Sequence, residues 1–304
     1  MVEDFGTRLQ SADVLVADGA IGTNLQAAGL TPGMPAEEWV IDRPDAIRSL
    51  HRSFVEAGSD LILTCSFGGN RIGMSRSQYA GRVAELNRSA AHMARLAADE
   101  ADRTIFVGGS MGPTGSLVEP YGSLGLDEVS EVFAEQARAL EEGGVDFLIL
   151  ETFFAIEEAR AAIEGVVRVS DLPLICSFSY DRGTRTMMGV SPTAMVDALG
   201  DLRLAAVGAN CGRTTDDMEE IIDELVAATD LPVWAKPNAG LPEGDPPHYR
   251  VTPEQMAAYG VRYRTHGARV IGGCCGTTPE HVKDIADAIQ GSTHDSTTRT
   301  PRDP

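Results

Sequence analysis

The stretch DFLILET, residues 146–152, places a short apolar run directly before a glutamate and a threonine. Such a run is typical of a strand that is buried on both faces of a parallel sheet. Residues 156–169 follow it, and their mixture of apolar and charged side chains predicts an amphipathic helix. The stretch therefore predicts one strand–helix unit whose strand leads into polar side chains.

The same unit recurs along the whole chain. Apolar runs that predict strands lie at residues 14–17, 60–64, 104–108, 146–150, 174–178, 204–208, 232–236 and 269–272. Segments of helical length lie at residues 45–57, 82–101, 126–142, 156–169, 193–199, 215–228, 253–266 and 279–289. Eight strands that alternate with eight helices favour an α/β fold, the single-domain (β/α)8 TIM barrel. A doubly wound open sheet is the alternative.

The predicted barrel occupies residues 1–291. Residues 292–304 are polar, with Thr, Ser, Asp, Arg and Pro and no apolar anchor. Such a segment has too little apolar surface to pack against a core, so we expect a disordered C-terminal tail.

Composition limits the class of protein. The 304 residues are 43% hydrophobic and 23% charged, as in a globular protein with a large core. Lys and Arg number 25 against 45 Asp and Glu, and the net charge of −20 repels phosphate backbones and anionic lipid. The chain has neither an apolar run of 18 residues nor a basic, apolar leader. We expect a cytoplasmic protein that binds neither nucleic acid nor membrane, and a homo-oligomer is left open.

Three cysteines are the most informative residues. The chain has five cysteines, an odd number that argues against a disulfide framework. Cys211, Cys274 and Cys275 follow predicted strands, and neighbouring glycines let the backbone turn so that adjacent side chains can converge. Three thiolates favour Zn²⁺ and leave one tetrahedral position for a substrate. Alternatively the three are ordinary buried cysteines, the role that we expect for Cys65 and Cys176.

Other polar residues also follow the predicted strands, among them Asp18, Ser110, Glu151 and Asn210. Reactive groups of α/β barrels lie at the C-terminal ends of the strands, so we expect these side chains to share one site with the cysteines. Asp18 and Glu151 could together hold the ammonium group of a ligand. Each could instead cap a helix or form a structural ion pair.

Four motifs at these strand ends resemble the homocysteine S-methyltransferase family. They are DGAIGTN at 18–24, GSMGPTG at 109–115, GANCG at 208–212 and IGGCCGTTP at 271–279. The motifs span nearly the whole chain. The resemblance implies a (β/α)8 barrel in which zinc is held by Cys211, Cys274 and Cys275.

The resemblance also implies a substrate site. Asp18, Gly19 and Glu151 match positions that hold the amino-acid end of homocysteine. Ser110 and Asn210 lie in two of the same motifs, and we expect them among the substrate-binding residues.

The function that the resemblance implies is zinc-dependent methylation of homocysteine to methionine. Coordination to Zn²⁺ delivers the thiol as a thiolate, which attacks an activated methyl group. The donor is left open between a betaine-like onium compound and a separate methyl-corrinoid protein. Thr152 and the pair Gly68 and Gly69 stand where animal betaine enzymes carry tyrosine, while NAGLP at 238–242 resembles the methionine synthase module.

Two other functions stay open on the residues alone. A zinc hydrolase of the same architecture would use mainly His and carboxylate ligands, but the six histidines show no ligand-like spacing. We expect those histidines at the surface or in loops. A non-catalytic zinc or thiol-binding barrel is the second alternative, and it would close its metal site with a fourth Cys or His.

Overall fold

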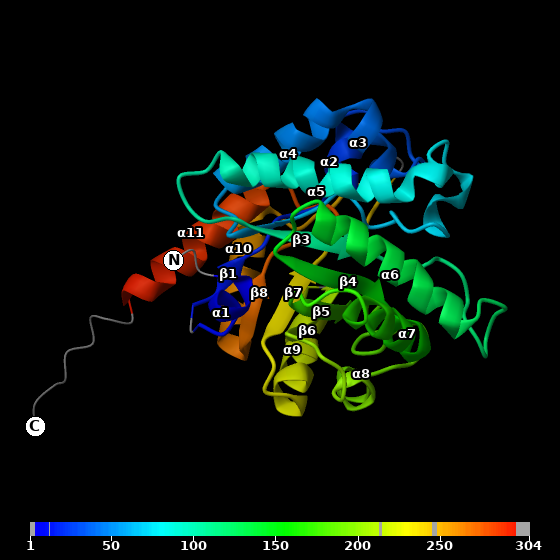
Figure 1. Cartoon of the computed structure of the whole chain (residues 1–304). Helices are drawn as coiled ribbons and strands as arrows, with labels where there is room; N and C mark the ends of the chain where they lie inside the picture. Colours follow the sequence, from blue (N-terminus) through cyan, green and yellow to red (C-terminus); the bar gives the residue numbers. More distant parts are fainter. Residues whose placement is uncertain (1–3, 12, 213–214, 245–247, 296–304) are drawn as a thin grey trace, which may run out of the picture.

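The computed structural model describes residues 4–11, 13–212, 215–244 and 248–295, and it shows a ring of parallel strands surrounded by helices (Figure 1). The eight strands are β1 (Leu15–Val16), β2 (Leu61–Leu63), β3 (Phe106–Met111), β4 (Phe147–Phe153), β5 (Leu174–Phe178), β6 (Ala206–Cys211), β7 (Val233–Pro237) and β8 (Ala268–Ile271). Their hydrogen-bonded order is β1-β8-β7-β6-β5-β4-β3-β2. A parallel bridge between Ala17 and Leu61 joins β1 to β2. The ring therefore closes, which confirms the (β/α)8 barrel and excludes the open sheet.

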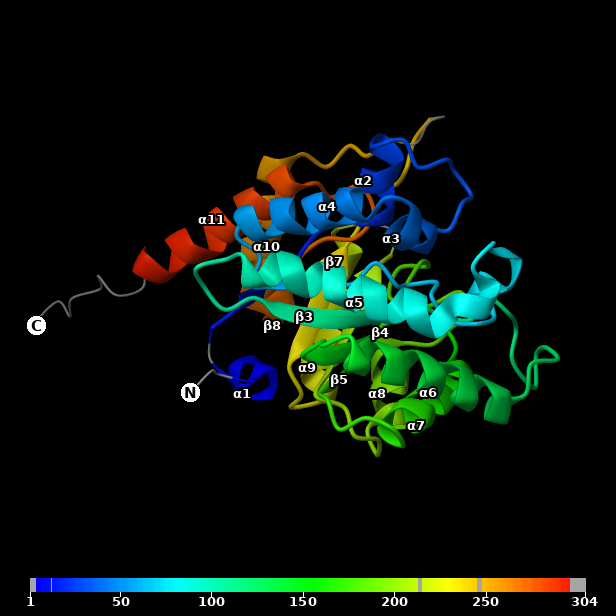
Figure 2. The same cartoon turned by 45° about the horizontal axis from the view of Figure 1, so that its top comes forward.

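Helices cover the outside of the ring (Figures 1 and 2). The eight predicted helices are present as α4 (Pro44–Glu56), α5 (Val83–Asp99), α6 (Leu126–Glu142), α7 (Ile156–Val167), α8 (Pro192–Leu199), α9 (Asp217–Ala228), α10 (Pro253–His266) and α11 (Pro279–Asp295). Three more were not predicted: α1 (Phe5–Leu9), α2 (Gly22–Ala27) and α3 (Trp39–Asp42). Their five, six and four residues are too few to show a helical period. Short 3-10 helices add η1 (Ala36–Glu38), η2 (Gly73–Arg76) and η3 (Ala80–Arg82).

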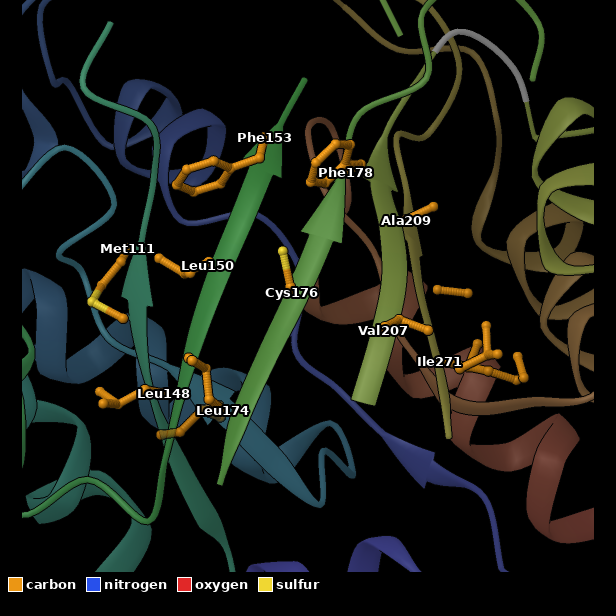
Figure 3. Close-up of a cluster of buried hydrophobic side chains, with 14 of the residues drawn as sticks. Met111, Leu148, Leu150, Phe153, Leu174, Cys176, Phe178, Val207, Ala209 and Ile271 are labelled. Carbon is orange, nitrogen blue, oxygen red and sulfur yellow. The ribbon is translucent and has the colours of Figure 1, made fainter. Parts of the chain in front are cut away.

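Successive strand residues point alternately into the barrel and toward the helices. In β4, Phe147 and Ile149 pack with the side chains that fill the barrel. Leu148 and Leu150 pack in the outer layer with helix residues (Figure 3). Burial of each such side chain contributes roughly 1.5–3 kcal/mol to folding. Cys176 lies in the same outer layer, which confirms its packing role.

Helix α1 closes the N-terminal end of the barrel. The ring of Phe5 stacks on Phe147 with centroids 4.0 Å apart, and it meets Phe106 edge-on at 5.4 Å. Asp4 caps the helix by accepting a hydrogen bond from the Thr7 amide at 2.9 Å. Because apolar rings fill this end, the opposite end of the barrel is the one that can admit a polar ligand.

Three strands extend three residues beyond their predicted ends. β3 continues to Met111, β4 to Phe153 and β6 to Cys211. The strands therefore contain four polar residues that were expected to follow them: Ser110, Glu151, Thr152 and Asn210. Cys211, for example, still pairs with Pro237 of β7. A polar side chain predicts the end of a strand, but Ser110 and Asn210 still pair with Ile149 and Lys236 of neighbouring strands. In β4 the register shifts between Leu150 and Phe153, and pairing with β5 then resumes.

The C-terminal helix also extends beyond its predicted end. α11 continues to Asp295 and thus includes residues 292–295, the beginning of the expected tail. The rest of that tail, residues 296–304, lies outside the described residues.

The expectation for the histidines is wrong for two of them. His51 and His281 are buried, and His51 is fully enclosed on α4. Burial lowers the pKa of His51 to about 4, so the residue is neutral and packs in the helix layer.

Across the described residues, no helix has the length and apolarity that a membrane crossing requires.

Candidate metal and substrate site

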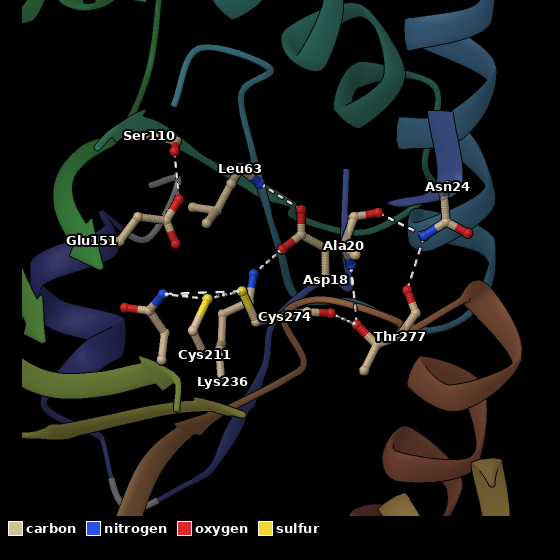
Figure 4. A network of polar contacts seen from close by, with 11 residues as sticks. Asp18, Ala20, Asn24, Leu63, Ser110, Glu151, Cys211, Lys236, Cys274 and Thr277 are labelled. Atoms are coloured by element: carbon tan, nitrogen blue, oxygen red, sulfur yellow. Dashed lines mark hydrogen bonds and ion pairs between the residues drawn. The ribbon is translucent and has the colours of Figure 1, made fainter. Parts of the chain in front are cut away.

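A cavity of about 540 Å³ lies at the C-terminal ends of the strands. Six of the eight residues predicted for the site line it: Gly19, Ser110, Glu151, Cys211, Cys274 and Cys275. The other two, Asp18 and Asn210, are fully buried behind its wall. Figure 4 shows the polar residues of this region, which come from strands far apart in the sequence.

The three cysteines converge on one point. Cys211 ends β6, while Cys274 and Cys275 follow β8, and the three sulfur atoms all lie within 4.8 Å of one another. The Sγ atoms of Cys211 and Cys274 are 2.9 Å apart. All three side chains are partly exposed, whereas Cys65 and Cys176 are buried. This arrangement differs from that of ordinary packed cysteines and can hold a metal ion.

A turn after β8 allows two adjacent cysteines to face the same point. The Cys274 amide donates to the Pro237 carbonyl at 2.7 Å, and the Cys275 amide donates to Asn238 Oδ1 at 3.0 Å. Gly276 follows with φ of 81°, in the left-handed region. A Cβ atom there would lie 2.1 Å from the Tyr249 ring. The glycine is therefore required both for the turn and for the close approach of Tyr249.

Hydrogen bonds within the cluster stabilise a thiolate. Bonds from the Cys211 and Cys274 thiols lower the pKa of Cys275 to about 3, and the Tyr249 hydroxyl adds a further hydrogen bond. The same contacts raise the pKa of Cys211. A metal ion would replace these shared protons, since thiolates are the form that coordinates metals.

The buried side chain of Asn210 forms hydrogen bonds with residues on neighbouring strands. Its Oδ1 accepts hydrogen bonds from the Thr152 amide at 2.9 Å and from Ser177 Oγ at 2.7 Å. Its Nδ2 donates to Thr152 Oγ1 at 2.7 Å and toward Cys211 Sγ at 3.6 Å. Thr152 and Cys211 have φ of 66° and 56°, the left-handed values that cost non-glycine residues about 1–3 kcal/mol each. Asn210 therefore contacts the residues that surround the cavity but is not among those that line it.

Both carboxylate oxygens of Asp18 accept hydrogen bonds from other residues of the protein. Its Oδ1 accepts a hydrogen bond from Lys236 Nζ at 2.5 Å, and its Oδ2 accepts one from the Leu63 amide at 2.8 Å. Burial raises the pKa of Asp18, and the Lys236 ammonium opposes that rise. This is the structural ion pair that the sequence left as an alternative.

Lys236 is a site residue that the sequence analysis missed. It lies on β7, its side chain is 4% exposed, and it lines the cavity. Burial lowers its pKa, but attraction to Asp18 and Glu151 outweighs burial and the net shift is upward, so the side chain stays protonated. A lysine at the end of an apolar strand was the available signal, because a buried lysine needs a counter-ion.

Glu151 places a carboxyl group in the wall of the cavity that also contains the three cysteines. The Ser110 hydroxyl donates a hydrogen bond to its Oε1. Burial raises the pKa of Glu151 to about 7, and Lys236 and Ser110 oppose the rise. The carboxyl group can therefore carry a negative charge near neutral pH and attract a ligand cation.

Comparison with known sequences identifies the family. The sequence model of homocysteine S-methyltransferases matches residues 15–289. Methionine synthase from Mycobacterium tuberculosis is 31% identical over 296 residues, which cover 92% of this chain and 25% of that protein. The Mycobacterium leprae methionine synthase is also 31% identical, over 293 residues. The chain spans about a quarter of the length of these curated relatives.

Comparison with solved structures agrees with the sequence comparison. The metallated form of the homocysteine methyltransferase MmuM from Escherichia coli has a TM-score of 0.79 and 25% identity, with 92% of this chain and 97% of that one covered. Its oxidised form gives a TM-score of 0.78 at 24% identity. With the family model matching most of its length, the chain belongs to the homocysteine S-methyltransferase family.

Proposed function

We propose that this protein is a zinc-dependent homocysteine S-methyltransferase that forms methionine. The observation that carries the proposal is the meeting of Cys211, Cys274 and Cys275 at the wall of a cavity that also contains a carboxyl group. Family membership supports the same substrate and reaction.

The donor set fits zinc. Zn–S bonds of about 2.3 Å in a tetrahedron separate the sulfurs by about 3.8 Å. The three sulfurs already lie within 4.8 Å, so small side-chain rotations suffice. Among the described residues no histidine or fourth cysteine joins the cluster, which leaves one position toward the cavity. Zinc bound there supplies the acidity that turns a coordinated thiol into a thiolate near neutral pH.

The protein's own residues then bind and orient the substrates. Glu151, supported by Ser110, holds the α-ammonium group of homocysteine. The cavity wall aligns the homocysteine sulfur with the donor methyl carbon, and holding the reactants in this way accelerates the transfer. A sulfur–carbon bond forms as the donor–carbon bond breaks, the electron pair leaves with the donor, and the thiol proton passes to solvent.

The donor is either a small onium compound or a methyl group carried by a separate corrinoid protein. Phe67 is the one aromatic side chain among the residues that line the cavity. Quaternary ammonium groups are usually held by several aromatic faces, so this wall fits a sulfonium or a protein-borne methyl group better than an animal-type betaine site.

A donor panel and one cysteine variant test the proposal. Zinc-loaded protein receives homocysteine with betaine, S-methylmethionine, dimethylsulfoniopropionate, methylfolate or methylcobalamin, and methionine is measured. We expect methionine from at least one donor, and Cys211→Ala should lose zinc and activity together. The matched control, Cys176→Ala, removes a buried thiol outside the site and should keep both. A Cys211→Ala protein with full turnover would remove zinc from the reaction.

A structural zinc module and a hydrolase are less well supported. A structural site would be closed by a fourth ligand, whereas this cluster borders a cavity of about 540 Å³. A hydrolytic zinc site uses mainly His and carboxylate ligands, which the cluster does not contain.

A further inference from the structure

The cavity wall has one cation. Among the residues that line the cavity, Lys236 is the one with a cationic side chain, and Glu37 and Glu151 are the acidic ones. Glu37 Oε1 accepts a hydrogen bond from the Gly68 amide at 2.6 Å, so it serves the loop after β2. The charges beside the cysteines are therefore one ammonium, on Lys236, and one carboxyl, on Glu151.

Asp18 is not available to a ligand, so Lys236 and Glu151 are the charged groups that a ligand can contact. Both oxygens of Asp18 have protein partners, and it is fully buried behind the wall. It cannot take a ligand's ammonium group without giving up Lys236. Glu151 is then the carboxyl group left for a ligand cation, and Lys236 is the group left for an anion.

The ammonium group of Lys236 has hydrogen-bond donors beyond the one that Asp18 accepts. An ammonium group offers three N–H donors, and one of them goes to Asp18. The charge of Lys236 interacts with Glu151 and with Cys274. It therefore lies close to both the carboxyl group and the metal ligands.

These positions match the shape of an amino-acid thiol. Homocysteine carries its ammonium and carboxylate on one carbon, and its sulfur lies about 5 Å from the carboxylate carbon when the chain is extended. A cation and an anion side by side near three cysteines are complementary to such a zwitterion. A thiol that lacks either charge would leave one of the two side chains without a partner.

We propose that Lys236 is a specificity-determining residue that binds the α-carboxylate of homocysteine, next to the α-ammonium group that the proposed function places at Glu151. This assignment rests on the proposed function. The competing explanation is that Lys236 only neutralises Asp18 and has no contact with substrate.

Three thiols separate the two explanations. Binding of homocysteine, 4-mercaptobutanoate and 3-aminopropane-1-thiol to the zinc-loaded protein is measured by calorimetry. The second lacks the ammonium group and the third lacks the carboxylate. Lys236→Met should weaken homocysteine and 4-mercaptobutanoate about 10- to 100-fold, as expected for loss of a charge-assisted hydrogen bond. It should weaken 3-aminopropane-1-thiol far less.

A double variant excludes the structural explanation. Asp18→Asn with Lys236→Met removes both charges and leaves no unpaired buried ion, so it also serves if the single variant does not fold. We expect the same selective loss of the two carboxylate ligands. Restored homocysteine binding, or an equal loss for all three thiols, would overturn the assignment. The chain has two lysines, and Lys283→Met, at a 61% exposed side chain on α11, is the matched control.

Methionine formation is scored separately from binding. A wild-type protein that shows the expected binding pattern but forms no methionine contradicts the proposed function and keeps the assignment of Lys236. A protein that forms methionine while Lys236→Met fails to discriminate among the thiols contradicts the assignment alone. Wild-type protein that binds none of the three thiols contradicts both.

Discussion

Glu151 is the residue whose ionisation should be visible near neutral pH. Burial raises its pKa to about 7, while the Ser110 hydroxyl and the Lys236 ammonium oppose the rise. A raised pKa means that the carboxyl group is protonated and neutral below about pH 7 and charged above it. Attraction to a ligand ammonium group is therefore present at high pH and lost as the pH falls.

The first prediction is a pH-dependent affinity for homocysteine. The dissociation constant should rise as the pH falls through about 7, because protonated Glu151 no longer attracts the ammonium group. Glu151→Gln should bind weakly throughout and lack this step. The ratio of the two dissociation constants, measured by calorimetry from pH 6 to 8, removes the contribution of thiol ionisation that both proteins share. A ratio that does not change with pH would contradict the role given to Glu151.

At the scale of secondary-structure elements, Asn210 connects the ends of three strands. Its side chain on β6 contacts Thr152 on β4 and Ser177 on β5, and it donates toward the sulfur of Cys211. The two left-handed residues, Thr152 and Cys211, lie at the ends of these contacts. The contacts fix where the β6 thiol points relative to the two cysteines after β8.

The second prediction concerns this connection. Asn210→Ala should lower zinc affinity about 10- to 100-fold, as is usual when a group that orients a metal ligand is removed. A competition assay with a chromophoric chelator measures it. Ser177→Ala, which removes one of the hydrogen bonds to Asn210 and leaves those to Thr152 and Cys211, should have a smaller effect. Equal zinc affinity in Asn210→Ala and the wild type would show that the strand ends hold their positions without Asn210.

Most of the elements could be predicted from the sequence. The strand–helix units are long and periodic, and the polar residues that follow apolar runs indicate the end of the barrel at which the cavity lies. The ends of β3 and β6 were misplaced because Ser110 and Asn210 remain paired with neighbouring strands despite their polar side chains. The end of β4 was misplaced because its pairing resumes at Phe153 after a register shift. Helices α1, α2 and α3 are too short to show a period.

The partners of the charged residues could not be predicted. Lys236 and Asp18 are 218 positions apart in the sequence, and their contact exists only because β1 and β7 lie in one closed ring. The same holds for the cysteines, where the sequence indicates the ligand set but not the sulfur distances. Barrel closure creates these contacts, and no local pattern records it.

At the scale of the whole molecule, the cysteine cluster links strands that are distant in the sequence. β6 carries Cys211, and the turn after β8 carries Cys274 and Cys275. The barrel also has a large apolar core of its own, with one cluster inside the ring and another beneath the helices. We therefore expect the barrel to fold without metal, in contrast to small zinc domains.

The third prediction follows from this arrangement. Removal of zinc with a chelator should lower the melting temperature by about 5 °C and leave the protein folded, because ligand at a hundredfold excess over its dissociation constant adds about 2.7 kcal/mol. Circular dichroism during heating measures the shift. Cys211→Ala, as the control, should not respond to the chelator. Complete unfolding of the wild type on chelation would mean that the metal is structural.

The most direct test of the account is the sulfur coordination of zinc with and without substrate. X-ray absorption spectroscopy of the zinc-loaded protein should show three sulfur ligands and one lighter atom. Addition of homocysteine should convert the site to four sulfurs and release one proton. A coordination shell that homocysteine leaves unchanged, or one with fewer than three protein sulfurs, would contradict the claim that Cys211, Cys274 and Cys275 hold a metal open to the substrate thiol.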